Sequence, residues 1–164
     1  MIIFWIVWTV GLALILAYGA VLIYGAPYFP TLSKEVEASL DLIDLQPGQV
    51  IYDLGCGDGR LLRAAARRGL RAVGYELNPF MALISWVGTL RYRRLVKVRM
   101  LNFWLADLSE ADGVFVFLIG HFMQRLAGKF ANNLKPGAKV VSHAFQIPGR
   151  KPAKKHDALF LYKY

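Results

Sequence analysis

The chain has 164 residues, which is enough for one domain of ordinary size and too few for two. Its 56% apolar content is high for a soluble protein, and the excess lies at the N-terminus. The formal net charge is +9, and the single cysteine, Cys56, excludes an intrachain disulfide and agrees with a reducing compartment.

Residues 1–24 are almost entirely aliphatic and aromatic, and no Asp, Glu, Lys or Arg precedes Lys34. A helix of this length can cross a hydrocarbon core of ~30 Å. A cleaved signal peptide is the alternative, but it usually has a basic start and a shorter apolar run. We therefore expect 1–24 to be a transmembrane helix that lies in the lipid bilayer.

All 20 Lys and Arg residues lie on the C-terminal side of this segment. The positive-inside rule then places the N-terminus outside and the globular part in the cytoplasm. The expected topology is a single-pass membrane protein.

A Pro-rich connector, 25–33, follows the apolar segment, and its prolines favour an extended chain. Ser33 is the expected cap of a helix over 34–45, which has an apolar stripe and an acidic outer face. We assign 34–164 to one folded domain.

Strands and helices then alternate along the chain. Apolar or alternating runs predict strands over 50–54, 71–77, 95–101, 113–119, 138–145 and 158–164. Helical patterns fall at 58–70, 78–92 and 121–134, and Asn78 is expected to cap the second of these with Pro79 in its first turn. This order predicts an α/β fold with a Rossmann-like, doubly wound, mostly parallel sheet.

The stretch VIYDLGCGDGR joins the first strand to its helix through three glycines at alternate positions, Gly55, Gly57 and Gly59. A dinucleotide fingerprint needs a small residue where Arg60 stands, and a phosphate-binding P-loop needs a Gly-Lys-Ser/Thr that is absent. The acidic Asp53 beside the loop repels a pyrophosphate and attracts a cationic ligand.

Two more polar side chains stand at or just after the ends of the next two strands. Glu76 lies at the end of the second strand, where a carboxylate can accept both hydroxyls of a ribose. Asn102 follows the third strand and is placed to bind an adenine edge. A cationic centre, a ribose and an adenine together describe S-adenosylmethionine.

These residues resemble motif I and the following acidic motif of class I S-adenosylmethionine-dependent methyltransferases, here VIYDLGCGDGR and VGYELNP. The order of one membrane span, PYFPT and this core is similar to that of the membrane-anchored protein-lysine N-methyltransferases. Animal members of that family modify the ATP synthase c subunit and the adenine nucleotide translocase, and prokaryotic relatives have the same layout. The resemblance implies a lysine side chain of a membrane-associated protein as the methyl acceptor.

The same resemblance implies the roles of individual residues. Tyr28 and Thr31 of PYFPT would form part of the active site over the methionine end of the cofactor. The residues expected to bind the cofactor are Asp53, Gly55, Cys56, Gly57, Asp58, Gly59, Glu76, Leu77 and Asn102. The family fold usually ends in a strand hairpin, but only one clear strand follows 138–145, so we expect a shortened C-terminus. No metal is implied.

Several residues also have plain structural interpretations. Asp58 suits the N-cap of the helix that follows the loop, and Cys56 fills a small space there and is no nucleophile. His121 is expected at a helix start, and His143 is expected to be packed or paired within its strand. Three arginines spaced as one helix face are expected to be solvated: Arg60, Arg63 and Arg67.

Two other functions stay open at this stage, and a third is not expected. The acceptor can be a lipid or lipophilic small molecule, or the chain can be a non-catalytic membrane adaptor that binds the cofactor. Nucleic acid is not the expected partner, because IGHF stands where amino-directed enzymes carry an Asp/Asn-Pro-Pro-aromatic motif. The basic surplus, including Arg91 and Arg93, can hold the domain against anionic lipid headgroups.

Overall fold

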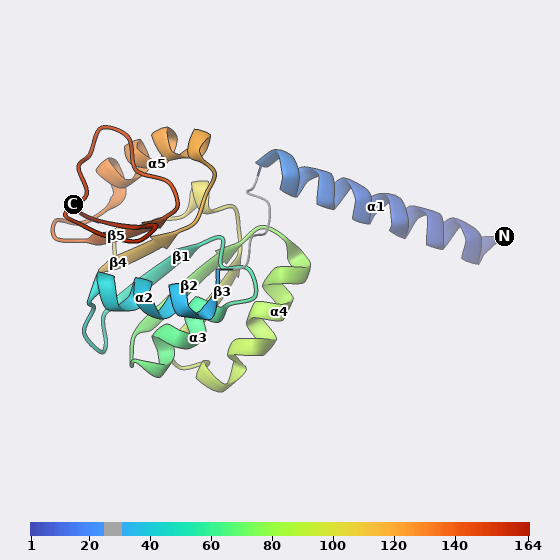
Figure 1. Ribbon diagram of the computed structural model, residues 1–164. Coiled ribbons are helices and arrows are strands. Elements are labelled where there is room, and N and C mark those ends of the chain that lie inside the picture. Colours follow the sequence, from blue (N-terminus) through green and yellow to red (C-terminus); the bar gives the residue numbers. More distant parts are fainter. Residues whose placement is uncertain (25–30) are drawn as a thin grey trace.

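The computed structural model describes residues 1–24 and 31–164, apart from the side chains of 13–18, 20–24 and 121 (Figure 1). The described strands are β1 (Val50–Leu54), β2 (Arg71–Glu76), β3 (Val96–Met100), β4 (Gly113–Val116), β5 (Lys139–His143), β6 (Lys154–His156) and β7 (Leu159–Lys163). They form one sheet in the order β3-β2-β1-β4-β5-β7-β6. The strands β1 to β5 are parallel, and β7 runs antiparallel to β5 and β6.

The helices connect these strands or precede them. They are α1 (Ile2–Tyr24), α2 (Ser33–Ile43), α3 (Arg60–Arg67), α4 (Pro79–Thr89) and α5 (Gly120–Asn133), with single 3₁₀ turns η1 (Leu90–Tyr92) and η2 (Phe103–Leu105). The expected doubly wound, mostly parallel α/β fold is confirmed. Strand order reverses between β1 and β4, so the carboxyl ends of these strands border the crevice where such folds bind ligands.

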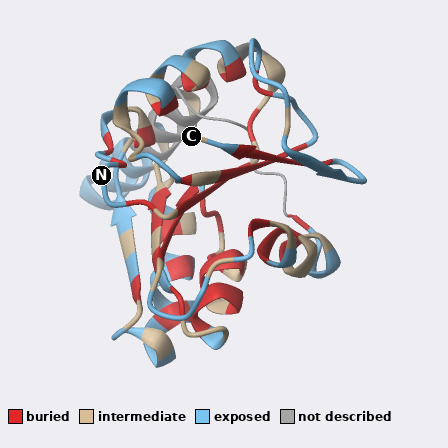
Figure 2. Ribbon diagram, turned by 90° about the vertical axis from the view of Figure 1, so that its left-hand side faces the viewer, coloured by how far each residue is buried: buried red, intermediate tan, exposed pale blue. Residues whose placement is uncertain are grey.

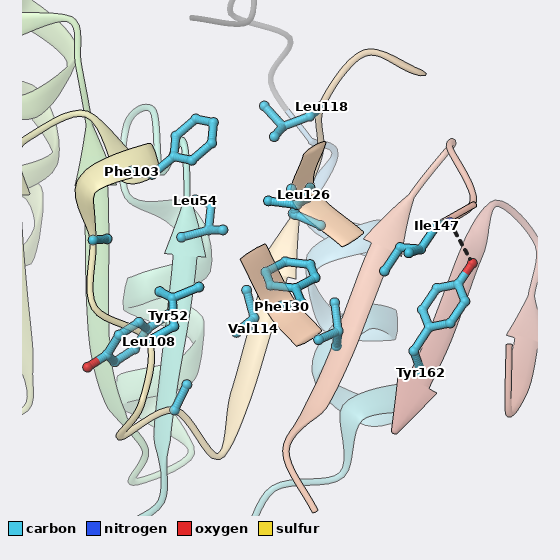
Figure 3. Packing of buried hydrophobic residues seen from close by; sticks show 14 of the residues in the cluster. Tyr52, Leu54, Phe103, Leu108, Val114, Leu118, Leu126, Phe130, Ile147 and Tyr162 are labelled. Carbon is cyan, nitrogen blue, oxygen red and sulfur yellow. Dashed lines mark hydrogen bonds between the residues drawn. The ribbon is translucent and has the colours of Figure 1, made fainter. Parts of the chain in front are cut away.

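Helices cover both faces of the sheet, because successive strand residues point to opposite sides. On one face, Tyr52 of β1 and Val114 of β4 pack with Phe130 of α5 (Figure 3). On the other face, Ile51 packs with α2 and α3, and α4 contacts α3, β2 and β3. Buried residues accordingly concentrate in the strands and in the helix surfaces that face them (Figure 2).

Helix ends differ in detail from the expected ones. The N-cap of α2 is Leu32, whose N–H donates to the Glu35 carboxylate at 3.0 Å, so Ser33 lies inside the helix. The N-cap of α3 is Gly59 and not Asp58, because the left-handed turn that leads into the helix falls at the glycine. The Asp58 carboxylate still accepts from the first helical N–H, at 3.1 Å. Asn78 caps α4 as expected, since its side chain accepts from two backbone N–H groups.

The expectation of a shortened C-terminus is wrong. β6 pairs antiparallel with β7, so the chain closes with a strand hairpin. The three residues of β6, Lys-Lys-His, are all exposed and have no apolar alternation, which explains why the sequence pattern does not show a strand. Tyr162 of β7 anchors the hairpin, because its hydroxyl accepts the Ile147 N–H at 3.0 Å in the buried core (Figure 3).

The expected N-terminal helix is present as α1, and Figure 1 draws it apart from the sheet. Within the parts of the chain whose side chains are described, no helix combines the length and apolar character of a membrane span.

We expect Phe130→Ala to lower the free energy of unfolding by about 3–5 kcal/mol, because Phe130 is fully buried and its loss leaves a cavity. Chemical denaturation in mild detergent measures this change. Phe80→Ala is the matched control, because Phe80 is 55% exposed and should change stability by no more than about 0.5 kcal/mol. Equal effects of the two substitutions would contradict the assigned core.

Candidate active site

The glycine loop between β1 and α3 depends on backbone angles that side chains rarely adopt. Gly55, Gly57 and Gly59 have φ values of 97°, 53° and 76°. A Cβ at Gly59 would also collide with the Ser85 hydroxyl of α4, so glycine is needed there for packing as well. A Cβ at Gly55 would meet no atom within 4 Å, so open space lies beside the loop.

Glu76 connects the end of β2 to this loop. One carboxylate oxygen accepts the Gly57 N–H at 2.9 Å, and the other accepts the Asn78 N–H at 2.8 Å. The Gly55 and Cys56 N–H groups donate to the Tyr75 carbonyl at 2.9 and 3.0 Å. The loop is therefore held against β2 by hydrogen bonds from three of its N–H groups, and Glu76 also fixes the start of α4.

Asp53 lies in β1 beneath the loop and is only 4% exposed. Burial, with the nearby negative charges of Glu76 and Asp58, raises the pKa of Asp53 to about 8. A buried carboxylate next to two others gains most from a ligand that brings a positive charge. This electrostatic environment agrees with the cationic ligand expected from the sequence.

Asp58 joins the loop to the segment that precedes α2. Its carboxylate pairs with Arg60 at 2.9 Å and lies 3.8 Å from Arg63, and the Arg60 guanidinium also donates to the Thr31 carbonyl at 2.6 Å. Partial burial alone would raise the pKa of Asp58, but the hydrogen bonds and charges of these arginines lower it. Arg60 and Arg63 are thus structural and not simply solvated, while Arg67 pairs with Glu37.

The remaining expected cofactor residues lie around the same loop. Cys56 is buried with its sulfur 3.6 Å from the Ser85 hydroxyl, and burial raises the pKa of its thiol, which agrees with its expected role as a space-filling residue and not a nucleophile. Leu77 is half-buried directly after Glu76. Asn102 caps η2 by accepting the Trp104 N–H at 3.1 Å, a structural role that the sequence did not indicate.

The structure describes one of the two expected catalytic residues. Thr31 is buried, at 8% exposure, and its carbonyl accepts a hydrogen bond from Arg60, which also pairs with Asp58 of the loop. Tyr28 lies outside the described residues, and so does the side chain of His121.

The structure adds His143 and Glu35 to this region. His143 ends β5, is 7% exposed, and has its Nε2 atom 3.7 Å from the Glu35 carboxylate in the first turn of α2. The centroid of its ring lies 4.3 Å from the ring centroid of Phe117, which follows β4. The Nδ1 atom has no hydrogen-bond partner among the described residues. The expectation that His143 is packed or paired is confirmed, but only the fold reveals Glu35 as its neighbour.

Among the described residues, no cluster of His, Cys, Asp and Glu could hold a metal ion. The polar groups that the structure does bring together are the loop glycines, Asp53, Asp58 and Glu76.

Comparison with known proteins identifies relatives of this chain. The family model of the ANTKMT methyltransferase domain matches residues 53–154. A protein-lysine N-methyltransferase of Saccharolobus islandicus is 38% identical over 133 residues, which cover 77% of this chain and 81% of that protein. The mouse lysine N-methyltransferase of the adenine nucleotide translocase is 36% identical, and the human lysine N-methyltransferase of the ATP synthase c subunit is 31% identical. Each match covers 77% of this chain but only about half of the relative, 56% and 54%.

Solved structures show the same fold. An RNA methyltransferase from Salinibacter ruber in complex with S-adenosyl-L-homocysteine has a TM-score of 0.78 and 32% identity, and the match covers 82% of this chain and 93% of that one. An S-adenosylmethionine-dependent O-methyltransferase from Thermotoga maritima has a TM-score of 0.60 at 18% identity, covering 71% of this chain and 46% of that one, and shows the fold alone.

We expect the stability difference between Asp53→Asn and the unchanged chain to depend on pH. Asp53 binds a proton more tightly when folded, so its contribution to the free energy of unfolding falls as pH rises from its ordinary pKa, 3.8, through about 8. The Asn variant lacks this loss and should become the more stable protein above pH 8. Denaturation at several pH values measures the difference, and a pH-independent difference would contradict the raised pKa.

Proposed function

The chain belongs to the family of the ANTKMT methyltransferase domain, and from this premise we propose that it methylates a lysine side chain of a membrane or membrane-associated protein. It is an S-adenosylmethionine-dependent enzyme of the protein-lysine N-methyltransferase class. The relatives named for lysine carry the proposed acceptor, and the buried Asp53 carboxylate beside a glycine loop with open space next to it supports the cofactor.

The described loop fits the cofactor by its chemistry. Burial raises the pKa of Asp53 to about 8, and a sulfonium or ammonium beside it would favour its ionised form, so that the two would pair. The glycines allow a ligand to approach the backbone. Glu76 uses each carboxylate oxygen for one N–H bond, and because each oxygen has a second lone pair, both can still accept a ribose hydroxyl. We propose that Cys56, Asp58, Leu77 and Asn102 complete this site.

When bound, S-adenosylmethionine supplies an electrophilic methyl group attached to a positively charged sulfur. A lysine that has first given its proton to water would form a bond from its neutral nitrogen to that carbon as the carbon–sulfur bond breaks. The electron pair would stay on sulfur, and the positive charge would pass to the methylated nitrogen. The protein's task is alignment, since the displacement is in line.

The acceptor must reach the site as a neutral amine. A free lysine has a pKa of ~10.4, and burial disfavours its charged form, so burial of the acceptor in the site would favour deprotonation. We propose that Tyr28, Thr31 and His143, whose Nδ1 atom has no hydrogen-bond partner among the described residues, position this amine. Support comes from the burial of Thr31 and His143 and from the place of His143 at the carboxyl end of β5.

We also propose that residues 1–24 anchor the enzyme in a membrane, followed by the connector 25–33 and the domain 34–164, with the N-terminus outside. This proposal is supported by α1 and by the absence of Asp, Glu, Lys and Arg before Lys34. Confinement to one plane would raise the effective concentration of a membrane protein substrate.

RNA is the second candidate acceptor. The Salinibacter ruber structure is named an RNA methyltransferase, and the net charge of +9 suits a polyanion. The sequence relatives named for lysine favour protein, and the IGHF stretch still lacks the motif of amino-directed nucleic-acid enzymes.

We expect the full chain, given tritiated S-adenosylmethionine and membranes and RNA of its source cell, to label a membrane protein on lysine. Glu76→Ala should abolish the label because it removes two backbone contacts, whereas Glu110→Ala, an exposed acid distant in sequence, should leave it unchanged. Label in RNA or in extracted lipid alone would overturn the lysine proposal. Cofactor binding without any label would indicate a non-catalytic adaptor.

A separate measurement tests the role of Asp53. S-adenosylmethionine and S-adenosylhomocysteine differ by the sulfonium charge, so their affinity ratio should rise as pH passes through about 8 and Asp53 ionises. Isothermal calorimetry at several pH values gives the ratio. Asp53→Asn should make it independent of pH, and an unchanged slope in this variant would place the sulfonium away from Asp53.

A further inference from the structure

The outer face of α4 exposes large apolar side chains that the domain does not cover. Five of them are at least 49% exposed: Phe80, Leu83, Ile84, Trp86 and Val87. Leu90 extends the row at 44% exposure. An amphipathic helix of a soluble domain normally presents polar residues there, so this face is built to meet something apolar.

The apolar surface continues onto the edge strand β3. Met100, the last residue of β3, is 66% exposed. Between α4 and β3 lies a shallow groove of about 350 Å³, lined by Pro79, Ala82, Leu83, Trp86, Val98 and Met100. We call these exposed residues of α4 and β3 the α4 surface.

Three arginines stand at the C-terminal end of the α4 surface. Residues 77–106 contain no Asp or Glu. Arg91, Arg93 and Arg94 directly follow α4 and are exposed, whereas Lys97 and Arg99 alternate with Val98 and Met100 of the groove and so point to the opposite face of the sheet. Exposed apolar side chains next to three arginines match an anionic bilayer, where the former enter the acyl boundary and the latter meet the headgroups.

We propose that the α4 surface docks the folded domain onto an anionic lipid bilayer. A protein partner covering the same area would have to supply acidic groups to balance the three arginines, and a second copy of this chain would bring three more to the contact. The bilayer satisfies both the apolar and the charged part. The inference concerns a surface of the domain and depends neither on residues 1–24 nor on the identity of the acceptor.

Docking in this way would bring the site close to the lipid. Pro79, the first residue of α4, stands three residues after Glu76, which holds the glycine loop. A substrate lysine would therefore be met near the headgroup level.

A fluorescent probe on the α4 surface tests the proposal in the full chain. Leu83→Cys carries an environment-sensitive nitrobenzoxadiazole label, since the native Cys56 is buried and resists labelling. Gln124→Cys, exposed on α5 at the other face of the sheet, is the matched control. The protein is reconstituted in phosphatidylcholine vesicles with or without phosphatidylglycerol, and lipids with a spin label near the headgroup act as quenchers.

We expect blue-shifted, quenched emission at position 83 in the anionic vesicles and water-like, unquenched emission at position 124. Replacing Arg91, Arg93 and Arg94 with Gln should lower the docked fraction, by about fivefold in the docking equilibrium for each arginine. Water-like emission at position 83 would overturn the proposal, as would a blue shift without lipid quenching, which would indicate a second copy or a protein partner. Methyl transfer is not measured, so these outcomes are separate from a failure of the proposed function.

Discussion

The Glu76 carboxylate accepts hydrogen bonds from two backbone segments that the chain separates, the glycine loop after β1 and the start of α4 after β2. Parallel strands make this possible, because β1 and β2 end at the same edge of the sheet. The loop has left-handed angles at three glycines and cannot continue the sheet ladder, so it depends on such external acceptors. Its shape, the start of α3 and the packing of Ser85 against Gly59 all follow from that attachment.

The same edge of the sheet holds an unfavourable charge arrangement. Asp53, Asp58 and Glu76 converge there, and the arginine pairs described above neutralise only Asp58. Burial of the ionised Asp53 carboxylate lowers the free energy of unfolding, and a bound cation would offset this loss. A site that is destabilised when empty is therefore consistent with a sulfonium ligand, and the arginine pairs keep Asp58 from adding fully to the repulsion.

Short local patterns predict much of this arrangement, including the strand VIYDL, the glycine spacing and the place of Glu76. β6 could not be predicted, because three exposed polar residues form a strand only when β7 lies beside them. Nothing local indicates that His143 lies beside Glu35, more than 100 residues earlier. Helical spacing wrongly predicted a solvated Arg60. Periodicity shows on which face of a helix a residue lies, but not which other segments of the chain contact that face. The uncovered apolar face of α4 escaped prediction for the same reason.

Arg60 couples the segment before α2 to the glycine loop, because its guanidinium contacts both Thr31 and Asp58. Coupling between two sites is reciprocal in free energy. If an ordered Thr31 segment raises the affinity of the loop for its ligand, then binding of the ligand stabilises the ordered segment by the same free energy. Order in the segment that leads into α2 is thereby linked to occupancy of the glycine loop.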